Sequence, residues 1–242
     1  MKPDRTINFQ NVEELSRAIR AARVSEERFS LDLPEKDVAN GLYSAMKAEV
    51  ERRGGIFVLD DDTRQHILSA AKWLVSPNAK FGLMLCGLYG NGKTTLAKAI
   101  SCLIEYVTEH ELGFTHRSRM EIVTAKNICR LCAAGEKFKE QLDAYESLFK
   151  TPMLIIDDLG EEPKEIMVYG MIHTPLIDLI SERYSRRLLT IITTNLDTDE
   201  IKDKYGPRIY DRFREMLTPI VFENESYRSR WSKSDSTLDN SQ

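Results

Sequence analysis

The stretch GLYGNGKTTLAKAI, residues 87–100, constrains the fold of this chain more than any other part of the sequence. It satisfies the spacing G-x-x-x-x-G-K-[ST] of a phosphate-binding loop, with one additional glycine inside the turn. Glycines let successive backbone N–H groups curl around a phosphate, the lysine reaches the β- and γ-phosphate oxygens, and the first threonine hydroxyl binds Mg²⁺. An apolar run precedes the loop and a helical pattern follows it, so the positive end of a helix is expected to face the anion. The nucleotide-binding residues predicted in this loop are Gly87, Gly90, Asn91, Gly92, Lys93, Thr94 and Thr95.

A second pattern, PMLIIDDL at residues 152–159, supplies the acidic half of such a site. Its apolar residues predict a buried strand, and Asp157 and Asp158 emerge at the carboxyl end, where open α/β sheets bind ligands. Asp157 is predicted to hold Mg²⁺ together with the Thr94 hydroxyl, and Asp158 to orient and polarise the attacking water as a general base. A solvated turn is the alternative, but two adjacent carboxylates beside a dry strand are costly without a cation nearby. We therefore expect ATP and Mg²⁺ as cofactors.

Short apolar runs alternate with helical patterns from about residue 60 onward. Each run is rich in Ile, Leu or Val and barely alternates with polar residues, as is typical of strands buried on both faces of a parallel sheet. Helices between such strands indicate an α/β layered fold, here a five-stranded parallel sheet flanked by helices. The predicted strands are residues 81–87, 120–125, 152–159, 188–195 and 219–224.

Residues 1–58 predict a small helical appendage ahead of the α/β domain, which we place at residues 59–228. Apolar residues at helical spacing form two stripes, which fit either local packing or the docking of another protein. The second helix is expected to run from Pro34 to Arg53. Residues 229–242 are polar and serine-rich and are predicted to be a disordered tail. The two stripes are Val12, Leu15, Ile19 and Ala22, then Val38, Leu42, Met46 and Val50.

The composition is that of an ordinary soluble protein, with 42% hydrophobic and 30% charged residues among 242. No run approaches the roughly 18 apolar residues that a membrane helix needs, and the amino end lacks the apolar stretch of a secretory signal. We therefore expect a cytoplasmic protein with no membrane partner. The net charge of −4 argues against wholesale coating of nucleic acid, but it leaves room for a local basic patch.

Four cysteines fit a reducing compartment. Cys129 and Cys132 form one C-x-x-C pair, but a tetrahedral zinc site needs four ligands and no second pair lies nearby. Buried thiols are the favoured interpretation.

Taken together, the motifs resemble the AAA+ ATPases, and within them the DnaC/IstB-type group of helicase loaders and transposition helpers. The resemblance covers about residues 60–230 and implies an AAA+ fold without the helical lid that most AAA+ proteins carry after the last strand. TIITTN looks like the sensor 1 strand, which implies that Asn195 lies beside the γ-phosphate. GPRIYDRF looks like the stretch with the arginine finger, which implies Arg212 as the finger and Arg208 as its neighbour. ENESYRSR looks like the terminal signature of the group, with Arg228 in a sensor 2-like place.

The residue chemistry agrees with these implied roles and leaves alternatives. The Asn195 carboxamide can donate to phosphate and accept from water, or it can cap a strand end. Arg208 and Arg212 are four residues apart, so on a helix they share one face and can reach the nucleotide of a neighbouring subunit, or form surface salt bridges. Asp158 stands where many AAA+ proteins have glutamate. Its shorter side chain is expected to make hydrolysis slow, as in a switch.

The resemblance leaves two functions open. The first is a helicase loader in DNA replication, which binds a replicative helicase hexamer and single-stranded DNA and assembles in an ATP-dependent way with its own copies. Lys126 and Arg130 are candidate DNA contacts, although a solvated helix face fits them equally well. The second is a transposition helper that binds duplex DNA and recruits a transposase. A third hypothesis, a P-loop enzyme that phosphorylates a small molecule, predicts a substrate lid with clustered arginines instead of the ring-completing arginine.

Overall fold

The computed structural model describes residues 12–14, 16–17, 28–112, 120–135 and 138–227. Its centre is a five-stranded sheet in which every pairing is parallel and the strand order is β2-β3-β6-β1-β7. The predicted α/β fold class, with five parallel strands flanked by helices, is therefore confirmed. The strands are β1 (Gly82–Gly87), β2 (Glu121–Thr124), β3 (Met153–Leu159), β6 (Leu189–Thr194) and β7 (Leu217–Phe222).

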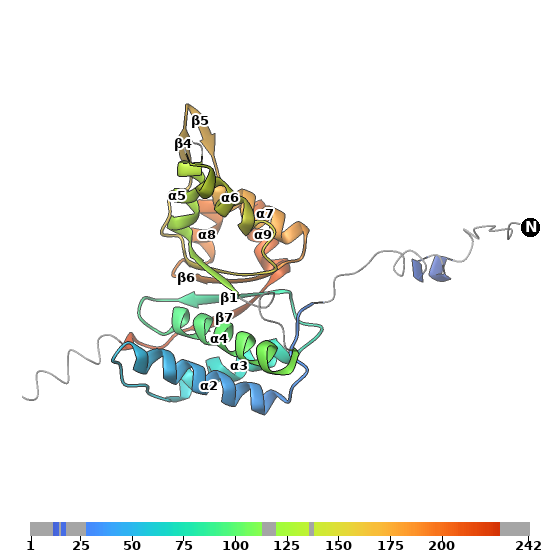
Figure 1. Cartoon of the computed structure of the whole chain (residues 1–242), viewed down its shortest axis with the longest axis vertical. Helices are drawn as coiled ribbons and strands as arrows, with labels where there is room; N and C mark the ends of the chain where they lie inside the picture. Colours follow the sequence, from blue (N-terminus) through green and yellow to red (C-terminus); the bar gives the residue numbers. More distant parts are fainter. Residues whose placement is uncertain (1–11, 15, 18–27, 113–119, 136–137, 228–242) are drawn as a thin grey trace, which may run out of the picture.

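Three helices cover one face of the sheet (Figure 1), namely α2 (Glu35–Arg52), α3 (Asp61–Val75) and α4 (Lys93–Leu112). Their apolar stripes form a single core with the strands, because Leu42 of α2, Leu74 of α3 and Ile100 of α4 are fully buried in one cluster with Leu85 of β1. Burial of this kind contributes about 1.5–3 kcal/mol for each large aliphatic side chain. The layer therefore holds α2 firmly to the helix that begins at the phosphate loop.

The helix predicted from Pro34 to Arg53 is confirmed by α2. The chain division near residue 58 stays a prediction, and the described helix that precedes this point packs in the same core as the helices that follow it. Most of the first apolar stripe lies outside the described residues. Val12 is its described member, and 70% of its surface is exposed. Residues 228–242, which include the predicted tail, also lie outside the described part.

Five helices cover the opposite face, namely α5 (Ala125–Gly135), α6 (Lys139–Leu148), α7 (Pro175–Ser185), α8 (Thr198–Tyr205) and α9 (Pro207–Met216). They form a second hydrophobic cluster with the sheet residues whose side chains point to this side, such as Ile156 of β3 and Ile192 of β6. Helix α8 follows β6 closely and begins with a capping box between Asp197 and Glu200. The molecule is thus a three-layer α/β/α sandwich with the carboxyl ends of all five strands at one edge.

A short β-hairpin, β4 (Ile166–Val168) and β5 (Met171–His173), projects beyond this layer (Figure 1). It was not predicted. Tyr169 and Gly170 form its two-residue turn with φ of 47° and 80°, the left-handed pair that a tight hairpin requires. Asn-Gly and Asp-Gly are the usual sequence signals for this turn, and the isolated Gly170 was the weaker signal available here.

The described residues contain no helix long and apolar enough to cross a membrane. All four cysteines are free thiols. Cys129 is buried as predicted, whereas the prediction is wrong for Cys102, which is exposed on α4, and Cys86 and Cys132 are half-buried. In the described ranges, no group of three or more His, Cys, Asp or Glu side chains is arranged to hold a metal ion.

Arg183 of α7 is fully buried, and its guanidinium group connects this helix to the sheet. It donates to three backbone carbonyls, at 2.9 Å to Leu148, 2.7 Å to Thr151 and 2.7 Å to Leu189. Arg183→Leu leaves these carbonyls without donors in a dry environment. We expect the free energy of unfolding, measured by urea titration, to fall by about 3 kcal/mol or more.

The matched control is Arg186→Leu, one turn away on the surface of the same region, where the guanidinium pairs with Glu182 at 2.6 Å. Exposed pairs of this kind contribute up to about 1 kcal/mol. Equal losses of stability in the two variants would contradict the role assigned to Arg183.

Candidate functional site

The phosphate loop joins β1 to α4 at the carboxyl edge of the sheet, as its sequence predicts. Gly87 has a φ of 142°, and a Cβ atom at this position would lie 2.2 Å from the carbonyl oxygen of Phe222 in the neighbouring strand β7. Only glycine fits this close approach. Asn91 is almost fully buried, and its Nδ2 donates to the same Phe222 carbonyl at 3.0 Å. The loop is therefore anchored to β7 through both residues.

Lys93 is the first residue of α4, and only 6% of its surface is exposed. Its Nζ donates to the carbonyl oxygens of Gly87 at 2.8 Å and Leu88 at 2.6 Å, and to Asn91 Oδ1 at 3.1 Å. The ammonium group thus lies inside the curl of the loop, where the loop glycines leave room for a phosphate. It provides the only full positive charge among the predicted loop residues.

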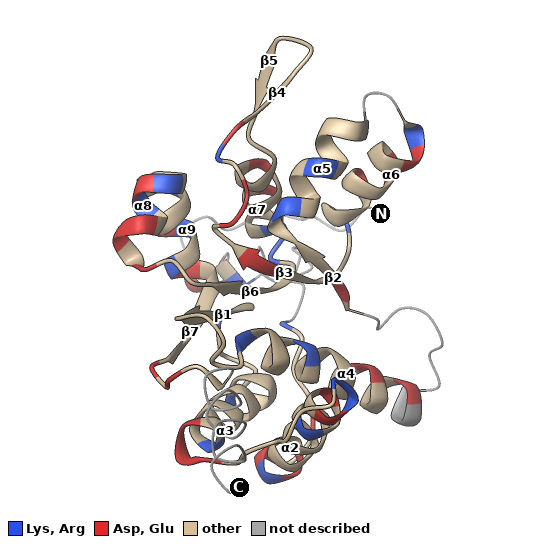
Figure 2. Cartoon of the chain, turned by 90° about the vertical axis from the view of Figure 1, so that its left-hand side faces the viewer, with Lys and Arg blue, Asp and Glu red and all other residues tan. Residues whose placement is uncertain are grey.

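The acidic residues of β3 meet the phosphate loop at the same edge (Figure 2, where the end of β3 is red). Asp157 is buried, and its Oδ1 accepts from Thr94 Oγ1 at 2.8 Å and from Thr193 Oγ1 at 2.6 Å. Thr94 and Asp157 are the two residues predicted to hold Mg²⁺, and the fold brings them into direct contact. A hydroxyl and a carboxylate are hard oxygen donors, which fit Mg²⁺ and leave further positions for phosphate oxygens and water.

Asp158 has an unusual backbone for a residue with a side chain, with a φ of 55°. Its N–H donates to Thr193 Oγ1 at 2.9 Å, which helps to hold this conformation. Partial burial raises the pKa of the Asp158 carboxyl, and the nearby carboxylates of Asp157 and Glu161 raise it further, against the opposing charges of Lys93 and Lys126. A raised pKa makes the carboxylate a better proton acceptor, which suits a general base.

A cavity of about 430 Å³ opens beside the loop, and its walls contain most of the predicted nucleotide-binding residues together with Asp158 and Asn195. Its other wall is apolar and was not foreseen. The end of α2 and the segment after it provide that wall, with Met46, Val50, Ile56, Phe57 and Val58. The predicted residues in the lining are Gly90, Asn91, Gly92, Lys93, Thr94, Thr95, Asp158 and Asn195.

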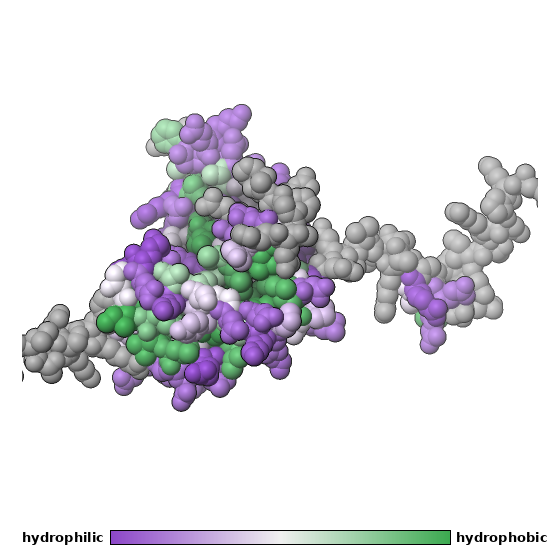
Figure 3. Space-filling view, turned by 60° about the horizontal axis from the view of Figure 1, so that its bottom comes forward, coloured by the Kyte–Doolittle hydropathy of each residue, from purple (hydrophilic) through white to green (hydrophobic). Residues whose placement is uncertain are grey.

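Much of this apolar wall faces outward, since Ile56 is 79% and Val58 46% exposed. Figure 3 brings the underside of the molecule forward and shows hydrophobic surface among the hydrophilic residues of this layer. A flat, apolar base fits such a wall, while the phosphates fit the polar loop at the other end. The wall follows from the apolar residues of the run GGIFVL after α2, to which no role was assigned from the sequence.

Tyr227 closes the cavity from the C-terminal side. Its N–H donates to the Gly90 carbonyl at 2.9 Å, and its hydroxyl lies 2.7 Å from Thr63 Oγ1 and 3.0 Å from Asp60 Oδ1. The residue therefore ties the phosphate loop to the start of α3. It belongs to the motif that carries Arg228, and Arg228 itself lies outside the described residues.

An exposed chain of polar contacts crosses the mouth of the site. Tyr89 of the phosphate loop donates to Glu161 Oε1 at 2.7 Å, and Lys126 at the start of α5 lies 3.2 Å from Glu161 Oε2. The hydrogen bond to Glu161 raises the pKa of the Tyr89 hydroxyl. Lys126, one of the two candidate DNA contacts, is therefore paired with a carboxylate next to the site, and Arg130 is exposed on the same helix.

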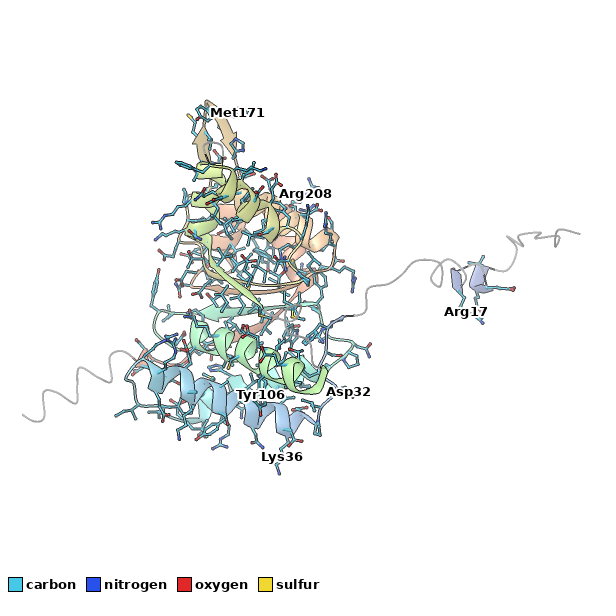
Figure 4. All side chains as sticks on the ribbon, viewed as in Figure 1. Arg17, Asp32, Lys36, Tyr106, Met171 and Arg208 are labelled. Carbon is cyan, nitrogen blue, oxygen red and sulfur yellow. The ribbon has the colours of Figure 1, made fainter. Side chains whose placement is uncertain are left out.

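Neither Arg212, the predicted finger, nor its predicted neighbour Arg208 lines this cavity. Arg208 is exposed near the start of α9 and is labelled in the upper half of Figure 4, whereas α2 and its cavity wall lie in the lower half. Arg212 is half-buried on α9, donates to Ser181 Oγ, and lies with its guanidinium carbon 5.4 Å from the centre of the Tyr184 ring. The structure thus gathers the loop, Asp157, Asp158 and Asn195 in one place and keeps Arg208 and Arg212 apart from them within the chain.

Asp158→Asn is expected to raise the melting temperature while it removes the proposed base. A raised pKa in the folded state means that ionisation of Asp158 opposes folding above that pKa, and that the penalty vanishes below the ordinary pKa of about 3.9. The variant should therefore melt at a higher temperature than the wild type near neutral pH, and the difference should shrink as the pH falls toward about 4. Thermal unfolding at several pH values measures it. A lower melting temperature for the variant at neutral pH would contradict the conclusion that the surroundings of Asp158 disfavour its charged form.

A parallel sheet in this strand order, a phosphate loop ahead of α4 and an acidic pair at the end of β3 define a P-loop protein with the AAA+ fold. Comparison with solved structures confirms the predicted fold. A crystal structure of the DnaC helicase loader matches with a TM-score of 0.53 and 23% identity, over 69% of this chain and 93% of that one. A crystal structure of DnaI matches with a TM-score of 0.51 and 21% identity, over 79% and 95% of the two chains.

AMPPCP-bound DnaA from Aquifex aeolicus matches with a TM-score of 0.51 and 15% identity, over 81% of this chain and 56% of that one. At these identities the likeness is one of fold. Models of protein families give no match to the chain, and a search among curated proteins gives none either. The predicted resemblance to DnaC-type AAA+ proteins is confirmed in the fold.

Proposed function

We propose that this chain is an ATP-hydrolysing helicase loader that acts on single-stranded DNA during DNA replication. The observation that carries the proposal is the 2.8 Å contact between Thr94 and Asp157, which joins the phosphate loop to the acidic strand end where we propose that Mg²⁺ binds. Asn195 and Asp158 line the same cavity. DnaC and DnaI, whose folds this chain shares, support the choice of a loader.

Each residue has a distinct task in this proposal. Lys93 neutralises the β- and γ-phosphates, and the loop N–H groups position them. Thr94 and Asp157 would hold Mg²⁺, which would supply charge stabilisation for the phosphates. Asp158 accepts a proton from the attacking water, and Asn195 orients that water or the γ-phosphate. The short Asp158 side chain makes turnover slow, so that the nucleotide acts as a switch.

Arg212 completes the site of a neighbouring copy. Its distance from the cavity of its own chain suits a residue that acts in trans, because a guanidinium supplied by the next subunit links hydrolysis to assembly. Arg208 lies one turn away on α9 and adds a second positive charge to that surface. Assembly also places Lys126 and Arg130 of successive copies along a shared path for DNA phosphates.

The decisive experiment measures ATP hydrolysis by the full chain with and without single-stranded or duplex DNA, followed by co-purification with a replicative helicase. Stimulation by single-stranded DNA and capture of the helicase support the loader. Filaments on duplex DNA without helicase binding indicate the transposition helper instead. A phosphorylated metabolite in place of free phosphate would overturn both in favour of a small-molecule kinase.

A further inference from the structure

A buried polar network joins the loop after β3 to helix α8. Glu162 is 4% exposed, and its two carboxylate oxygens accept from Gly160 N at 2.9 Å and from the hydroxyl of Tyr205. Lys204 Nζ lies 3.4 Å from Glu162 Oε1. The same ammonium donates to the backbone carbonyls of Gly160 and, at 2.6 Å, of Glu162. Three of these contacts end on the backbone of residues 160–162, so the network fixes the path of the main chain.

The main chain fixed in this way begins two residues after Asp158. Asp158 and Gly160 both have a positive φ, of 55° and 112°, and such a backbone persists only where its surroundings hold it. A Cβ atom at Gly160 would lie 2.7 Å from the side chain of Leu196, so the loop also presses against the residue that follows Asn195. The loop that follows Asp158, the proposed base at the end of β3, is therefore held between Leu196 and α8.

We infer that Glu162 is a positioning residue for ATP hydrolysis: together with Lys204 and Tyr205 it fixes against α8 the loop that directly follows the strand end with Asp158, and so sets the rate of the chemical step and not the affinity for nucleotide. This inference rests on the proposed ATPase function. Neither Glu162 nor Lys204 lines the cavity, so their effect on the reaction passes through the position of the loop.

The physical argument for this role is the cost of the network. A buried ion pair contributes little to stability, because the free-energy cost of removing two charges from water offsets much of their electrostatic attraction. Apolar side chains of similar size often stabilise the folded state equally well. The Glu162–Lys204 network has a larger effect on loop conformation than on stability, because its charge-assisted hydrogen bonds to three backbone groups define one path of the main chain. Displacement of a reacting group by about 1 Å can lower a rate by about 100-fold.

The test compares Glu162→Gln and Lys204→Met with the wild type as full-length proteins. We expect kcat for ATP hydrolysis to fall by about 10- to 100-fold in each variant, while KM and the affinity for a fluorescent ATP analogue stay within about twofold. The matched controls are Glu165→Gln, exposed three residues further along, and Lys202→Met, on the same helix with an exposed pair to Asp199 at 2.9 Å. Both controls should keep the kcat of the wild type.

A second measurement separates positioning from stability. The double variant Glu162→Gln/Lys204→Met removes both charges, so its melting temperature should recover relative to the single variants, whereas its kcat should stay low. If kcat recovers along with the melting temperature, or if the folded single variants hydrolyse ATP like the wild type, the inference is overturned. Failure of the wild type itself to hydrolyse ATP would overturn the proposed function and, with it, this inference.

Discussion

Lys93→Ala is expected to lower the affinity for ATP by at least about 100-fold, or about 2.7 kcal/mol, because one buried ammonium group supplies the positive charge inside the phosphate loop. The 6% exposure of Lys93 and its bonds to two loop carbonyls place that charge where the phosphates are proposed to bind. Alanine leaves the phosphate loop itself with neutral N–H donors only. Titration with a fluorescent ATP analogue measures the loss.

The matched control is Lys98→Ala, on the same helix, whose ammonium lies 3.8 Å from Glu49 of α2. This substitution should leave nucleotide affinity within about twofold, since Lys98 does not line the cavity and its partly buried pair with Glu49 lies away from the phosphate loop. Circular dichroism shows whether the Lys93 variant keeps the helical content of the wild type. A folded Lys93 variant with the ATP affinity of the wild type would contradict the proposal that this loop binds the phosphates of ATP.

Arg212→Ala is expected to lower ATP hydrolysis by assembled protein by about 1000-fold, the range found when an arginine finger is removed, with ATP affinity within about twofold. Within its own chain the residue contacts Ser181 and Tyr184 and lies outside the cavity, so its loss should disturb neither the binding site nor the fold. Steady-state hydrolysis at increasing protein concentration measures the effect. Arg214→Ala, two residues along on the same helix, is the control that should keep activity.

Mixing two inactive variants tests the trans arrangement directly. Lys93→Ala subunits keep Arg212 but bind little ATP, and Arg212→Ala subunits bind ATP but lack the finger. If the arginine acts on the neighbouring site, the mixture should regain hydrolysis that neither variant shows alone. An inactive mixture, together with lost ATP binding by the Arg212 variant, would place the residue in its own subunit or in folding.

The sequence predicted the centre of the molecule well, because the centre is built from local patterns. Each apolar run became a strand, with β7 starting at Leu217 where Pro219 was expected. The carboxyl ends of parallel strands share one edge, so Thr94 and Asp157 could be expected to meet although 63 residues separate them. Their contact follows from fold class and motif together.

Other features depend on contacts between segments that are distant in the sequence, and local sequence patterns do not predict them. The apolar cavity wall at Ile56–Val58 exists because α2 packs against α4 and delivers the following segment to the loop. The Glu162 network needs a carboxylate and a lysine 42 residues apart in the chain. From the sequence alone these residues would be placed on the solvent-exposed surface, where most Glu and Lys side chains lie.

Helix α2 extends from the periphery of the molecule to the cavity beside the phosphate loop. Met46 and Val50 on the last turns of this helix, and Arg53 directly after it, form part of the cavity wall, while the rest of the helix lies along the outer side of the sandwich. Because the buried face of α2 packs in one cluster with α4 and β1, a displacement of α2 would disturb the same core that positions the phosphate loop. The apolar wall of the cavity and the placement of Lys93 therefore depend on one set of packing contacts.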